Sequence, residues 1–110
     1  MLNHVVLLGI DVGNVVSGVV ALLDGKIDFV KTVDNRQVFD VVRGYMGKYD
    51  SVEVVVEDIK PFAGNLSQQA IDTCKFIGQL TWRLDEIEAK YTLMNRAAVR
   101  KWVYETLTTW

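Results

Sequence analysis

Two acidic residues stand directly after runs of branched apolar residues and are the first candidates for chemistry. Asp11 follows the apolar run at residues 5–10. Glu57 follows the run at residues 54–56. If the two runs form neighbouring parallel strands, both carboxylates reach one crevice at the carboxyl edge of a sheet. Two like charges held close repel each other unless a cation neutralises them, and carboxylate oxygens suit Mg²⁺ or Mn²⁺. We therefore predict that Asp11 and Glu57 are metal ligands and catalytic residues of a metal-assisted hydrolysis.

Three runs of mostly apolar residues at the start of the chain predict the strands that position Asp11. The runs cover residues 3–11, 15–23 and 26–33. The pair Asp24-Gly25 between the last two runs is a strong signal for a two-residue hairpin. We therefore expect the chain to open with an antiparallel meander. Acids also end strands simply because strands end at water, and that structural alternative stays open for Asp11 and Glu57.

The rest of the chain alternates helical and strand patterns. The expected elements are a helix over residues 36–48, a strand over 51–57, a loop over 58–66, a helix from 67 to about 90, a strand over 91–94 and a helix over 95–105. Asp34 or Asn35 can cap the first helix and Asn95 the last, because short side-chain oxygens bond free backbone N–H groups. A right-handed crossover would place strand 51–57 beside the first strand and parallel to it, which brings the two acids together.

Length and composition limit the possible classes of protein. The 110 residues are half apolar and 24% charged, which fits one folded domain and excludes a disordered chain. The net charge of −2 gives no support by itself to a nucleic-acid partner. No apolar run reaches the roughly 18 residues of a membrane span, so we expect no membrane association. Cys74 is the single cysteine and cannot form an internal disulfide, so we expect a cytoplasmic protein.

The residues around the two acids resemble a known superfamily. Gly9-Ile10-Asp11-Val12-Gly13, followed by Ser17-Gly18, resembles the opening hairpin of the RNase H-like superfamily. Val54-Val55-Val56-Glu57 resembles its fourth strand, which ends in the second catalytic acid. Within the superfamily the chain looks most like the RuvC-type Holliday-junction resolvases of the phage and mobile-element branch. The resemblance implies an α/β fold, a mixed five-stranded sheet flanked by helices in the order βββαβαβα.

This resemblance also implies an activity and partners. The chain would belong to a metal-dependent, structure-selective endonuclease that resolves branched DNA, with Mg²⁺ or Mn²⁺ held by Asp11 and Glu57. Such resolvases act as homodimers, and the helix from residue 67 to about 90 is the candidate dimer face. The residues expected to contact DNA are Lys60, Phe62, Asn65, Arg96 and Lys101. Resolvases of this type use four acids, with the last pair on a C-terminal helix. We therefore expect residues 1–110 to be a single RNase H-like domain that lacks its C-terminal part, with an incomplete active site.

Two other functions stay open. An ATP-binding domain of the actin-like and sugar-kinase type opens with a similar hairpin, and a non-catalytic RNase H-like interaction module would need no complete set of acids. A basic face beside the two acids could be formed by Lys60, Lys75, Arg83, Arg96, Arg100 and Lys101, although an ordinary solvated surface with interleaved acids explains these residues slightly better. We expect Cys74 and the three tryptophans Trp82, Trp102 and Trp110 to be packing residues. Gly78 should let its helix approach the sheet, and His4 should be structural or merely exposed.

Overall fold

The computed structural model describes residues 3–59, 67–95, 97–98, 101 and 105. Its elements are β1 (Val5–Asp11), β2 (Val16–Leu23), β3 (Lys26–Asp34), α1 (Asn35–Lys48), β4 (Ser51–Asp58), α2 (Gln68–Glu86) and β5 (Lys90–Asn95). This order confirms the predicted βββαβαβ series. Ala97, Ala98, Lys101 and Glu105 are helical as well. The other residues of the predicted last helix lie outside the described ones.

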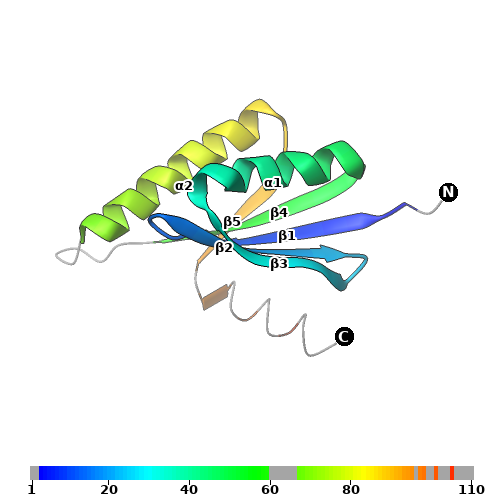
Figure 1. The fold of residues 1–110 in the computed structure, drawn as a ribbon, viewed down its shortest axis with the longest axis horizontal. Coiled ribbons are helices and arrows are strands. Elements are labelled where there is room, and N and C mark those ends of the chain that lie inside the picture. The colour runs from blue at the N-terminus through cyan, green and yellow to red at the C-terminus, as the bar shows by residue number, and fades with distance from the viewer. Residues whose placement is uncertain (1–2, 60–66, 96, 99–100, 102–104, 106–110) are drawn as a thin grey trace.

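The five strands form one mixed sheet in the order β3-β2-β1-β4-β5 (Figure 1). The pairs β1–β2 and β2–β3 are antiparallel, whereas β1–β4 and β4–β5 are parallel. The crossover through α1 therefore returns the chain to the free side of β1, as the sequence predicts. The carboxyl ends of β1 and β4 meet at one edge of the sheet, which we call the carboxyl edge.

The turn between β2 and β3 is the predicted two-residue hairpin. Asp24 and Gly25 have φ angles of 50° and 81°, and positive values at both positions are what a type I′ turn requires. The Asp24 carboxylate also accepts hydrogen bonds from the backbone N–H of Val5 at 2.9 Å and pairs with Nδ1 of His4 at 2.6 Å. This contact ties down the beginning of β1. His4 therefore lies at the end of the sheet opposite Asp11, in the structural role expected of it.

Both helices begin at a capping residue. The Asp34 Oδ1 atom accepts from the backbone N–H of Arg36 at 2.9 Å, so Asp34 rather than Asn35 is the N-cap of α1. The Ser67 hydroxyl accepts from the N–H of Ala70 at 3.1 Å and caps α2 in the same way. Asn95 is also a cap, because its Oδ1 atom accepts from the N–H of Ala98 at 2.8 Å.

The helix α2 ends four residues earlier than predicted. The backbone reverses at Glu88, whose φ of 56° lies in the left-handed region. Two hydrogen bonds close the reversal, from Glu88 N–H to the Asp85 carbonyl at 3.1 Å and from Ala89 N–H to the Leu84 carbonyl at 2.9 Å. These two bonds form a Schellman motif, which usually has glycine at the left-handed position. The sequence predicts a helix to about residue 90 because Glu88, unlike a glycine, does not signal a helix end.

The core lies between the two helices and one face of the sheet. Figure 1 shows α1 and α2 on the same side of the strands. Val6, Leu8 and Ile10 are at most 1% exposed and point to that side from β1. The buried residues of α2 are Thr73, Ile77, Leu80 and Leu84. No helix of the described residues is long and apolar enough to cross a membrane.

Two expectations for α2 are wrong. Trp82 is 67% exposed, because it lies on the face of the helix opposite the buried stripe. Gly78 is also exposed, and a Cβ atom there would meet nothing within 4 Å, so its lack of a side chain is not needed for packing. Cys74 is half-buried beside the stripe, as expected of a packing residue. Trp102 and Trp110, for which the same packing role was expected, lie outside the described residues.

Candidate active site

The register of β1 and β4 brings the two candidate acids together. Ile10 lies opposite Val56 in the parallel pair, and Asp11 and Glu57 are the next residue in each strand. Ile10 and Val56 are buried under the helices, so the alternation of the strands directs Asp11 and Glu57 to the other face. Neighbouring strands lie about 4.8 Å apart. The two carboxylates therefore project from adjacent strands, on one face and at one edge.

The two carboxylates have different surroundings. Asp11 is exposed, whereas Glu57 is 4% exposed. A buried carboxylate has few rotamers available and keeps a fixed position, while an exposed one can meet a ligand that arrives from solvent. The pair thus combines one anchored oxygen donor with one that is open to water. Asp58 follows Glu57 and is half-buried, with its backbone in register with Asn95 of β5.

Gly18 keeps the space beside Asp11 open. The two residues are paired across the antiparallel strands β1 and β2. A Cβ atom at Gly18 would lie 3.7 Å from the Cβ atom of Asp11, which is ordinary van der Waals contact. A larger side chain at this position would extend over the Asp11 carboxylate. The glycine therefore leaves room for a ligand on the β2 side of the acid.

Three residues brace the turn that follows Asp11. The Gly13 N–H donates to the Ser17 hydroxyl at 3.3 Å, and that hydroxyl donates to Asn35 Oδ1 at 2.6 Å. The Asn35 Nδ2 group then donates to the Gly13 carbonyl at 2.9 Å. We call Gly13, Ser17 and Asn35 the hairpin brace. It links the first residue of α1 to the β1–β2 turn and so fixes the position of Asp11.

The hairpin brace could be only partly predicted from the sequence. Gly13 and Ser17 belong to the motif that carries the superfamily resemblance, whereas the sequence predicts for Asn35 only a role as a helix cap. Since Asp34 already supplies the cap, the neighbouring amide is free to bond elsewhere. Two capping residues in succession are therefore the sequence signal that could have indicated a second role for Asn35.

The comparisons with known proteins concern the fold. No family model matches the chain, and no curated protein matches it in sequence. Among solved structures, T. thermophilus RuvC in complex with Holliday junction substrate superposes with a TM-score of 0.65. The match covers 89% of this chain and 69% of that chain, at 13% identity. The fold is RNase H-like. An identity this low establishes the fold alone.

Within the RNase H-like fold, the donor set is suited to a hard cation. No group of three or more His, Cys, Asp or Glu side chains gathers among the described residues. Two carboxylates nevertheless fit Mg²⁺, which is commonly held by one or two carboxylates and completes its shell with water and substrate phosphates. Asp11 and Glu57 fit Mn²⁺ for the same reason, because both ions prefer oxygen ligands.

The residues expected to contact DNA are mostly outside the described part of the chain. These are Lys60, Phe62, Asn65 and Arg96. Lys101 is described and exposed, with its Nζ atom 4.0 Å from Glu105 Oε1 one helical turn later. An exposed pair of this kind is weak, so the Lys101 ammonium remains available to a phosphate. Its predicted contact with DNA stays a prediction.

Proposed function

We propose that the chain is a metal-dependent nuclease domain that hydrolyses phosphodiester bonds in branched DNA. The parallel register of β1 and β4 is the observation that carries this proposal, because it brings Asp11 and Glu57 to one face of the carboxyl edge. The fold supports it as well, since a solved RNase H-like neighbour is a RuvC in complex with a Holliday junction substrate.

Asp11 and Glu57 would hold the Mg²⁺ or Mn²⁺ ion. Such an ion, when bound, supplies an activated water and stabilises charge on the scissile phosphate. Buried Glu57 fixes one ligand position relative to the sheet. Exposed Asp11 offers its oxygens where a phosphodiester can approach, and Gly18 leaves that approach open.

The domain bounds, the branch of the family, the oligomeric state and the DNA contacts are part of the same proposal. The domain would cover residues 1–110 and belong to the phage and mobile-element branch of cytoplasmic resolvases. A homodimer would suit two symmetric nicks on a four-way junction, because each copy then meets one equivalent strand. Its candidate interface is on α2 (Gln68–Glu86), on the part of the helix surface that does not face α1. Lys60, Phe62, Asn65, Arg96 and Lys101 would contact the DNA.

The decisive experiment replaces each carboxylate by its amide. Asp11→Asn and Glu57→Gln should still bind a four-way junction but nick it about 100-fold more slowly or worse, because several kcal/mol of charge stabilisation are lost. Glu53→Gln is the matched control, since Glu53 lies on the same strand and face but four residues from Glu57. Nicking by Asp11→Asn at the wild-type rate would rule out the assignment.

Two further measurements separate the alternative functions. Calorimetric titration with Mn²⁺ should give binding that Glu57→Gln abolishes and Glu53→Gln retains. Absence of any Mn²⁺ binding to the wild-type chain would instead indicate a non-catalytic interaction module. A rise in melting temperature with Mg-ATP, but not with Mg²⁺ alone, would indicate an ATP-binding domain.

A further inference from the structure

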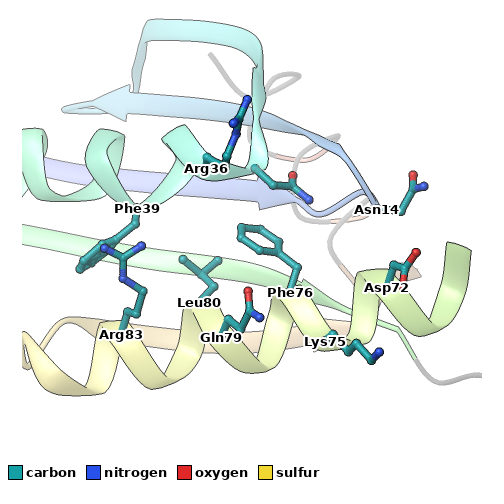
Figure 2. Close-up of a pocket in the computed structure, with 10 residues that line it drawn as sticks. Asn14, Arg36, Phe39, Asp72, Lys75, Phe76, Gln79, Leu80 and Arg83 are labelled. Carbon is teal, nitrogen blue, oxygen red and sulfur yellow. The ribbon is translucent and has the colours of Figure 1, made fainter.

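A groove runs between α1 and α2, on the face of the sheet opposite the two carboxylates. Its first part is a hollow of about 370 Å³, lined by Arg36 and Phe39 from α1 and by Lys75, Phe76 and Arg83 from α2 (Figure 2). A second hollow of about 510 Å³ shares Phe39 and Arg83 and adds Arg43 and Trp82. The shared residues place the two hollows next to each other, and we call them together the α1–α2 groove.

The groove has a cationic lining in a chain whose net charge is −2. Arg36, Arg43, Lys75 and Arg83 line it, against the two carboxylates Asp72 and Glu86. Arg36 is paired with Asp34 through Nε and Oδ1 at 3.1 Å. The other three cations have no carboxylate partner among the described residues. Positive charge is therefore concentrated here and available to an anionic ligand.

Arg83 is held in place by an aromatic ring rather than by an acid. Its guanidinium carbon lies 3.8 Å from the centroid of the Phe39 ring, and that of Arg43 lies 5.8 Å from it. Phe39 is 6% exposed and packs in the hydrophobic core. Stacking on a ring orients the guanidinium plane and leaves its N–H donors free for an anion, in the fork geometry that matches phosphate.

Trp82 supplies a second kind of contact in the same groove. Its side chain is 67% exposed beside Arg83. The unused amide side chain of Gln79 also lines both hollows. An exposed indole next to arginines combines a stacking surface for a base with charge for its phosphate. An acidic polypeptide would use the arginines but would gain little from the indole.

The groove leads to the carboxyl edge of the sheet. Asn14, which lies in the turn between β1 and β2, lines its first part (Figure 2). The residues of α2 that line the groove extend from Asp72 to Glu86. At 1.5 Å per residue, this is a length of about 20 Å. A chain of several nucleotides fits that length and would leave the groove next to the turn that follows Asp11.

We infer that the α1–α2 groove binds the backbone of single-stranded nucleic acid, with Arg43, Arg83 and Lys75 on the phosphates and Trp82 stacked on a base. Binding there requires neither Asp11 nor Glu57 and no metal ion. The groove would hold a strand that extends away from the carboxyl edge. Binding of nucleic acid in the groove can therefore be measured separately from cleavage.

The experiment measures binding of a fluorescent oligothymidylate of about 12 nucleotides in the presence of EDTA. Arg43→Gln/Arg83→Gln should weaken binding about 10-fold or more and reduce the slope of log affinity against log salt by roughly two. Lys75→Gln, which removes no contact with Phe39, should reduce the slope by roughly one. Lys26→Gln/Lys31→Gln is the matched control, since it removes two exposed charges from β3 and should leave the affinity within about twofold.

Trp82 and a competitor test the kind of ligand. Trp82→Ala should weaken binding roughly 5-fold or more, and Trp82→Phe should restore most of it, because any aromatic ring can stack on thymine. Polyglutamate should compete poorly. The inference would be overturned if the groove and β3 double variants lost equal affinity for the oligothymidylate. Unaltered binding by Trp82→Ala would also overturn it, and so would efficient competition by polyglutamate. Retention of binding by Asp11→Asn separates this result from any failure to cleave.

Discussion

Asn35 donates a hydrogen bond to the carbonyl of Gly13, 22 positions earlier in the chain, at 2.9 Å. The first residue of α1 thereby holds the turn that follows Asp11. Ser17 completes the contact, and its side chain is 1% exposed. The position of the candidate catalytic acid thus depends on a helix that contributes no carboxylate to it.

Asn35→Ala should destabilise the protein by about 1–3 kcal/mol, because it leaves the buried Ser17 hydroxyl and the Gly13 carbonyl without their partner. Urea unfolding followed by circular dichroism measures the change. Asn14→Ala, at an exposed position of the same turn, is the control and should change stability by less than about 0.5 kcal/mol. Equal effects of the two substitutions would show that the hairpin brace contributes nothing.

Gly13→Ala should prevent the turn from closing. A Cβ atom at Gly13 would collide with the Val16 carbonyl oxygen, and a backbone atom cannot yield as a flexible side chain does. We expect a loss of about 3 kcal/mol or more, or no soluble protein. The control Gly44→Ala lies on the exposed face of α1 with nothing within 4 Å and should stabilise by about 0.5–1 kcal/mol. Normal stability of Gly13→Ala would mean that the turn can adopt another conformation.

Glu88→Gly should stabilise the protein by about 1 kcal/mol. The left-handed conformation costs a residue with a side chain about 1–2 kcal/mol, and the greater flexibility of unfolded glycine offsets part of the gain. Gln79→Gly, at an exposed position inside α2, should instead destabilise by about 1 kcal/mol. Thermal unfolding of both variants gives their changes in melting temperature relative to wild type. The two changes have opposite signs if the chain reverses at Glu88, and the same sign if it does not.

The hydrogen bond from His4 and the one from the Val5 N–H hold the pKa of the Asp24 carboxyl below its usual value of 3.8. A lowered folded-state pKa contributes stability that is present above the unfolded value and is lost as the pH falls through the folded one. Stability should therefore drop more steeply below about pH 4 in wild type than in Asp24→Asn. Asparagine also suits the type I′ turn, so the variant should fold. Identical acid denaturation curves would contradict this role of Asp24.

Much of the fold follows from local signals in the sequence. The apolar runs and Asp24-Gly25 predict the meander, and the acids after two such runs predict the meeting of Asp11 and Glu57. The end of α2 could not be predicted, because Glu88 occupies a left-handed position with no glycine to mark it. Trp82 could have been placed correctly, since it falls outside the stripe of buried residues on α2.

The α1–α2 groove was beyond prediction for a different reason. Arg36 and Arg43 belong to one helix and Lys75 and Arg83 to another, and only the packing of the two helices brings these cations together. The sequence allows a basic face that includes Lys75 and Arg83, but it does not distinguish such a face from ordinary surface. The proximity of Phe39 to Arg83 depends on tertiary structure in the same way.

The direction of the two helices has an electrostatic consequence. The helices α1 and α2 have 14 and 19 residues, and both begin at the carboxyl edge, where β1 and β4 end (Figure 1). Peptide dipoles add up along a helix and place about half a positive charge at its N-terminus. The edge that bears Asp11 and Glu57 therefore receives a favourable potential for anions from the backbone itself. A net charge of −2 describes the chain as a whole but does not describe the side from which a polyanion would approach.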